Sequence, residues 1–71
     1  MESKLEVDLH RTAEALRVAY ESLDAVCTAQ RNTSALDSAW GAVAANARGT
    51  FAHVAVCEEA HRMAVVAWTN R

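Results

Sequence analysis

Residues 51–68 read FAHVAVCEEAHRMAVVAW, and this stretch decides the fold that we predict. Side chains that can share one face recur in it at alternating spacings of three and four residues, which is the period of an α-helix. They are Val54, Cys57, His61, Ala64 and Trp68. Two of the three histidines and one of the two cysteines also fall here, so the residues that could carry chemistry concentrate on the same predicted helix.

The composition of the whole chain predicts an all-α fold. The chain has 71 residues, of which 52% are hydrophobic, with two glycines and no proline. An all-β fold needs turn residues at each chain reversal, and they are nearly missing here. Alanine, the strongest helix former, dominates the apolar residues. The length allows one domain, residues 1–71, and a domain this small usually needs a disulfide framework, a metal or a partner chain for stability.

The first helix is predicted over about residues 3–30. Ser3 and Glu6 have the spacing of a capping box, in which the serine oxygen accepts from the backbone N–H of the glutamate. A nearly unbroken apolar stripe with heptad spacing follows them. It comprises Leu5, Leu9, Thr12, Leu16, Ala19, Leu23 and Val26.

A short turn over about residues 31–34 separates this helix from a longer second one, over about residues 35–69. Asn32 can take the left-handed conformation that ends many helices. Ser34 is placed as the N-cap of the second helix, and Asp37 would lie in its first turn, where the helix dipole favours a carboxylate. The stripe of residues 54–68 extends back in the same register through Leu36, Trp40, Val43, Ala47 and Thr50.

Gly49 leaves two architectures open. Glycine in a helix interior costs about 1 kcal/mol relative to alanine, so the helix could end there and give a three-helix bundle. The heptad register does not slip across Gly49, however, which favours an antiparallel helical hairpin with a long helix, a short turn and a longer helix. In this hairpin the second helix covers the first completely and extends beyond it near Trp68.

The hairpin predicts a homodimer, because two helices cannot enclose a core while a four-helix bundle can. Small residues lie on another side of the second helix, where they would let a neighbouring backbone come close, and apolar residues fill the predicted overhang. The expected interaction residues are Gly41, Ala45, Gly49, Val65 and Trp68.

Charge and hydropathy exclude several classes of function. The formal net charge is −2 and no run of Lys or Arg occurs, which argues against a nucleic-acid-binding protein. No stretch approaches the roughly 18 apolar residues of a membrane span. The charged first ten residues lack the apolar core of a signal peptide, so we expect a cytoplasmic protein with reduced thiols.

Metal binding is the alternative function that the sequence offers. His53, Cys57 and His61 recur every four residues, but they extend too far along a helix for one ion to bind all three. Glu58 and His61 form a Glu-x-x-His pair, which binds metals in ferritin-like bundles together with further glutamates. Glu6 of the first helix would lie near the same level and could complete such a site.

No catalytic set of residues is complete, and no cofactor motif occurs. The sequence therefore predicts a small, non-enzymatic interaction or regulatory protein without a cofactor, whose partners are a second copy of itself and another protein.

Overall fold

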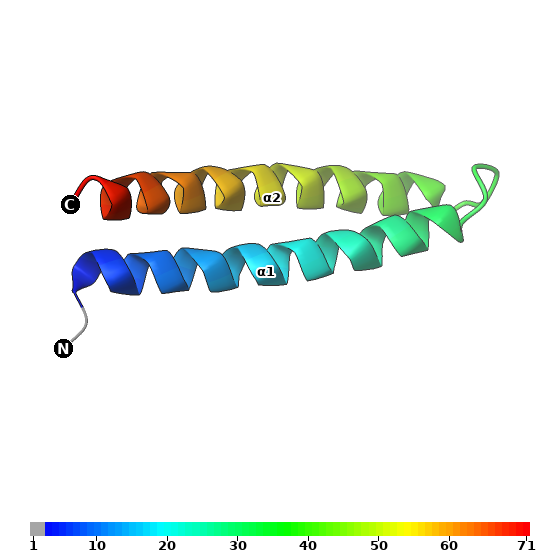
Figure 1. The fold of residues 1–71 in the computed structure, drawn as a ribbon. Coiled ribbons are helices and arrows are strands. Elements are labelled where there is room, and N and C mark those ends of the chain that lie inside the picture. Colours follow the sequence, from blue (N-terminus) through cyan, green and yellow to red (C-terminus); the bar gives the residue numbers. More distant parts are fainter. Residues whose placement is uncertain (1–2) are drawn as a thin grey trace.

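The computed structural model describes residues 3–71, so the first two residues of the predicted domain lie outside it. Two helices make up the fold, α1 from Lys4–Arg31 and α2 from Trp40–Thr69, and they pack against each other as a hairpin. Figure 1 shows that the start of α1 and the end of α2 lie together, opposite the loop that joins them. Within residues 3–71 the fold is all-α, as predicted, and α2 continues through Gly49.

The N-terminus of α1 forms as the capping motif predicts. Ser3 has an extended backbone, with φ −73° and ψ 160°, and its side-chain oxygen accepts a hydrogen bond from the backbone N–H of Glu6 at 3.2 Å. One of the N–H groups that a helix start leaves without a partner is thereby satisfied. Glu6 also places a carboxylate in the first turn, where the helix dipole favours it.

The connection between the helices is longer than predicted, because α2 begins at Trp40 rather than near residue 35. Ser34 does not cap the helix: its hydroxyl accepts from the backbone N–H of Leu36, two residues on. Asp37 likewise accepts from the N–H of Ala39 at 2.8 Å. Hydrogen bonds of this kind, from the backbone N–H two residues ahead to a side-chain oxygen, stabilise turns and compete with helix initiation. Leu36, predicted to lie in the helix–helix seam, is 96% exposed.

The C-terminus of α1 also differs from the prediction. Asn32 has φ −90°, so it is not left-handed, and its backbone N–H donates to the carbonyl of Thr28 at 3.1 Å. The hydroxyl of Thr33 donates to the carbonyl of Ala29 at 2.7 Å. These two donors satisfy carbonyls that the end of a helix would otherwise leave unpaired.

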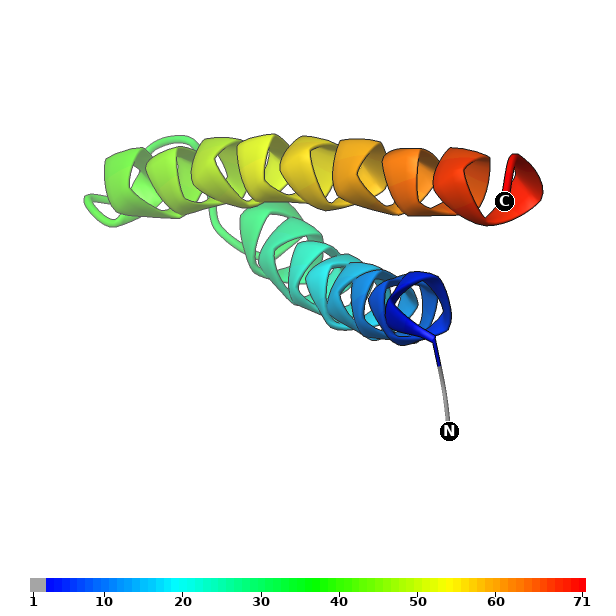
Figure 2. The same ribbon diagram turned by 90° about the vertical axis from the view of Figure 1, so that its left-hand side faces the viewer.

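The core is a thin seam between the two helices. Its buried members within residues 3–71 are small: Ala19, Ala47, Val54 and Cys57. Leu16 and Leu23 pack against them from α1 and stay partly exposed. The seam follows the predicted heptad positions from Trp40 onward. Figures 1 and 2 show that each helix has a single neighbour, so the side facing away from the seam is uncovered.

Neither helix combines the length and apolarity needed to cross a membrane, within the part of the chain that the structure describes.

Candidate functional site

Two polar contacts join α2 to α1 within the stretch of residues 51–68. Nδ1 of His61 lies 3.0 Å from the hydroxyl of Thr12, at the edge of the seam. Further along, the phenol of Tyr20 donates to the carboxylate of Glu58 at 2.8 Å. His61 and Glu58 thus both contact α1, and the Thr12–His61 contact marks the level at which the two helices meet.

The level at which the two helices meet differs from the one that the predicted metal site requires. In the structure Thr12 lies opposite His61, so Lys4 is level with Thr69 and the two helices end together. The predicted overhang at Trp68 is therefore absent. By the same count, Glu6 lies about nine residues, or about 13 Å along the axis, from the level of Glu58. The longer loop causes this shift.

The residues predicted to bind a metal consequently stay apart. No three His, Cys, Asp or Glu side chains gather into a group that could hold a metal ion among residues 3–71. Glu58 and His61 contact α1 separately, and Glu6 belongs to the capped first turn. A metal site built on Glu6, Glu58 and His61 is not assembled by one chain.

His53 and Cys57 form a closer pair on one helix. The Cys57 sulfur lies 3.6 Å from Nε2 of His53, which fits a thiol–imidazole contact one turn apart. Cys57 is 9% exposed and belongs to the seam, whereas His53 is exposed. Cys27 and Cys57 are both free thiols.

The residues predicted for interaction occupy different places on α2. Gly41 and Gly49 face open space, because a Cβ built on either would meet nothing within 4 Å. Ala45 is exposed as well. Trp68 is half-buried at the open end of the hairpin, where the guanidinium of Arg71 stacks 3.7 Å from its ring. Val65 is 40% exposed, on the side of α2 that also carries Glu58.

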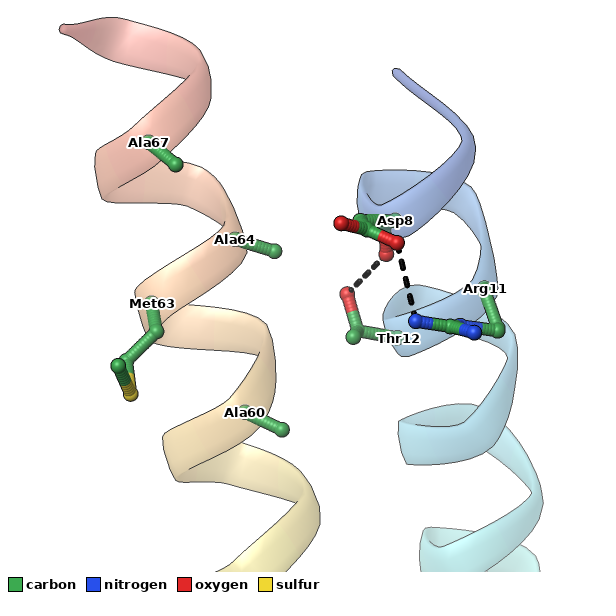
Figure 3. Close-up of a pocket in the computed structure, with 7 residues that line it drawn as sticks. All are labelled: Asp8, Arg11, Thr12, Ala60, Met63, Ala64 and Ala67. Carbon is green, nitrogen blue, oxygen red and sulfur yellow. Dashed lines mark hydrogen bonds and ion pairs between the residues drawn. The ribbon is translucent and has the colours of Figure 1, made fainter. Parts of the chain in front are cut away.

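A shallow groove lies between the helices near their open ends (Figure 3). Its volume is about 320 Å³. On the α1 wall, Arg11 pairs with Asp8 at 2.9 Å, and the hydroxyl of Thr12 donates to the Asp8 carbonyl at 2.8 Å. Alanines and one methionine form the α2 wall: Ala60, Met63, Ala64 and Ala67. The α1 polar groups are already paired with one another, and the α2 wall is apolar, so the groove suits an apolar neighbour.

The contact between Tyr20 and Glu58 predicts an alkaline titration that can be measured. Its hydrogen bond to the carboxylate, partial desolvation and the nearby negative charge raise the pKa of Tyr20 above its usual value of 10.0. Because the folded chain has the higher pKa, the stabilisation is present below pH 10 and is lost as the pH rises through the raised value. We expect Glu58→Ala to lower the pKa of Tyr20 towards 10.

Ultraviolet absorbance of tyrosinate measures this directly, since Tyr20 is the only tyrosine. Glu59→Ala is the matched control, because Glu59 is the neighbouring carboxylate and pairs with Arg62 instead, at 2.9 Å. If both variants titrated like the wild type, the hydrogen bond would not form in solution.

Sequence reasoning missed both contacts between the helices. The heptad stripe places Thr12 in the seam without naming a partner for it, and it does not include Tyr20. The signal that would have found them is the loop length, since a turn of eight residues brings Thr12 level with His61.

The chain has no match among models of protein families, curated proteins or solved structures.

Proposed function

We propose that this chain is a small, non-enzymatic interaction protein that acts as a homodimer. Two hairpins would form a four-helix bundle, and the outer surface of that bundle would bind another protein in a regulatory role. The free thiols of Cys27 and Cys57 fit the reducing cytoplasm that we propose as its location.

The accessible surface of the hairpin carries this proposal. The hairpin exposes 5102 Å², whereas a compact monomer of 7.7 kDa exposes about 4300 Å². The excess, about 800 Å², equals the area that one partner buries in a protein–protein interface of standard size. A single association of standard size between two copies would therefore bring the exposed area of each chain to that of a compact monomer of its mass.

The shape and the core support the same conclusion. The radius of gyration is 16.1 Å, against about 11 Å for a compact chain of this length. The largest buried side chain among residues 3–71 is a valine, Val54, while large apolar side chains such as Phe51, Val56 and Met63 are more than half exposed. Exposed apolar surface of this extent is typical of an interaction site.

The experiment that tests the proposal is a measurement of mass across a concentration series. Light scattering or sedimentation should give twice 7.7 kDa at micromolar concentrations, with dissociation on dilution. A mass of one chain throughout the micromolar range would contradict the proposal. Metal analysis of the same sample addresses the alternative: stoichiometric bound metal would favour the Glu58 and His61 site, completed by ligands from a second chain.

A further inference from the structure

A second helical stripe runs along α2 beside the one that packs on α1. It extends from Ala42 to Ala67 at alternating spacings of four and three residues, through Gly49, His53, Val56 and Ala60. Every residue in it is exposed, and none is Asp, Glu, Lys or Arg. A helix with two neighbours in a bundle needs two such heptad stripes, and one chain supplies a neighbour for only one of them.

A matching stripe on α1 lies on the same side of the hairpin. It extends from Ala15 to Ala29 through Val18, Ser22 and Ala25, and each of its residues is exposed and uncharged. The groove in Figure 3 shows that the two stripes lie on the same side of the hairpin. Arg11, which lies one turn before Ala15 and continues the α1 stripe, lines this groove together with three residues of the α2 stripe: Ala60, Met63 and Ala67. We call the two stripes together the uncharged face.

The opposite side of the hairpin differs in charge. Over the same length it carries the exposed ring of Phe51 together with five charged residues: Asp24, Arg31, Arg48, Glu58 and Arg62. The hydrogen bond from Tyr20 to Glu58 also spans the two helices there. The centres of protein interfaces are depleted of charged residues, and burying an ionised carboxylate without a cationic partner is costly. Next to the uncharged face, an ion pair lies at the open end of the hairpin, before the start of the α1 stripe. There Arg11 pairs with Asp8.

Gly49, near the middle of the α2 stripe, supplies a separate observation. Glycine weakens a helix interior relative to alanine. Its φ is not positive, and a Cβ at this position would meet nothing within 4 Å, so neither backbone conformation nor packing within the chain requires glycine. The close approach of a helix from outside the chain would require it.

We propose that the uncharged face is the surface on which a second copy of this chain docks. The inference rests on the proposed homodimer and names the side of the hairpin that forms it. A two-fold dimer brings the same surface of both copies together, so any net charge on that surface would meet its own sign. A face without charge avoids this repulsion, and Val56 and Met63, exposed by 67% and 60%, are its most exposed large apolar side chains.

Matched lysine substitutions on the two sides of α2 test the inference. Val56→Lys places a charge on the uncharged face, and Val66→Lys places the same charge on the opposite side of the same helix, at a residue that is 45% exposed and lies one turn after Arg62. We expect Val56→Lys to weaken self-association roughly 100-fold, because each dimer would bury two unpaired ammonium groups. Val66→Lys should stay within about threefold of the wild type. Sedimentation equilibrium measures both dissociation constants, and circular dichroism checks that the variants remain helical.

Ala60→Lys and Ala55→Lys repeat the comparison at two exposed alanines, in case a valine substitution disturbs folding. The same pattern is expected, with only Ala60→Lys weakening the dimer. A dimer broken by Val66→Lys or Ala55→Lys, or left intact by Val56→Lys and Ala60→Lys, would overturn the inference while leaving the homodimer in place. A monomeric wild type would overturn both the proposed homodimer and this inference.

Discussion

Replacing Ala19 with glutamate is expected to unfold the hairpin at room temperature. Ala19 is 1% exposed and lies in the core with Val54 and Cys57, so a longer side chain has no space there. A buried carboxylate without a cationic partner costs several kcal/mol. A chain of this length has a total stability of only about 4–10 kcal/mol. Far-ultraviolet circular dichroism should therefore show a large loss of helix and no cooperative thermal transition.

Ala13→Glu is the matched control, because it makes the same change in the same helix at an exposed position. Its effect on the free energy of unfolding should stay within about 0.5 kcal/mol, as for most surface substitutions. Equal effects at Ala13 and Ala19 would mean that the seam between the helices does not run through Ala19.

Replacing Trp40 with alanine is expected to cost about 2–3 kcal/mol in the free energy of unfolding. A fully buried tryptophan would cost about 3–5 kcal/mol, but Trp40 is only half-buried at the start of α2. Leu36→Ala should cost almost nothing, because Leu36 is 96% exposed in the loop. Urea denaturation measured by circular dichroism compares the two variants. A similar cost for both would indicate that Leu36 packs in the seam, as in a helix beginning near residue 35.

The centre of the seam was predictable from sequence because its chemistry repeats with the helical period. Ala19 on α1 and Val54 and Cys57 on α2 are buried where the heptad stripes place them. Periodicity of this kind needs no knowledge of the loop, since each helix presents its apolar side whatever lies at its end. The same signal continues across Gly49, and α2 does too.

The loop was not predictable in the same way. Ser34 and Asp37 are good N-cap residues, but their side-chain oxygens can accept from the backbone N–H two residues ahead as well as from the one three residues ahead. In the structure they accept from Leu36 and Ala39, which delays the helix to Trp40. The pattern of residue types is identical in the two arrangements, so it does not distinguish them.

Because the predicted loop is too short, every predicted contact between the helices is shifted along their axes. A helix rises 1.5 Å per residue, so a few additional loop residues shift the level at which side chains meet by several ångströms. Glu58 consequently contacts Tyr20 and not the vicinity of Glu6, and His61 contacts Thr12. A candidate site built from two helices therefore depends on the loop more than on the residues of the site.

The hairpin also favours one order in which the chain closes. Tyr20 and Glu58 are 38 residues apart in sequence, whereas Thr12 and His61, nearer the chain ends, are 49 apart. The entropy lost on closing a loop grows with its length, so contacts near the turn form at the lowest cost and bring the next pair together. Closure then proceeds from residues 32–39 towards the chain ends, and opening proceeds in reverse. The groove between Arg11 and Met63 lies in the part that closes last, so its amides should exchange with solvent hydrogen sooner than those around Ala19 and Val54.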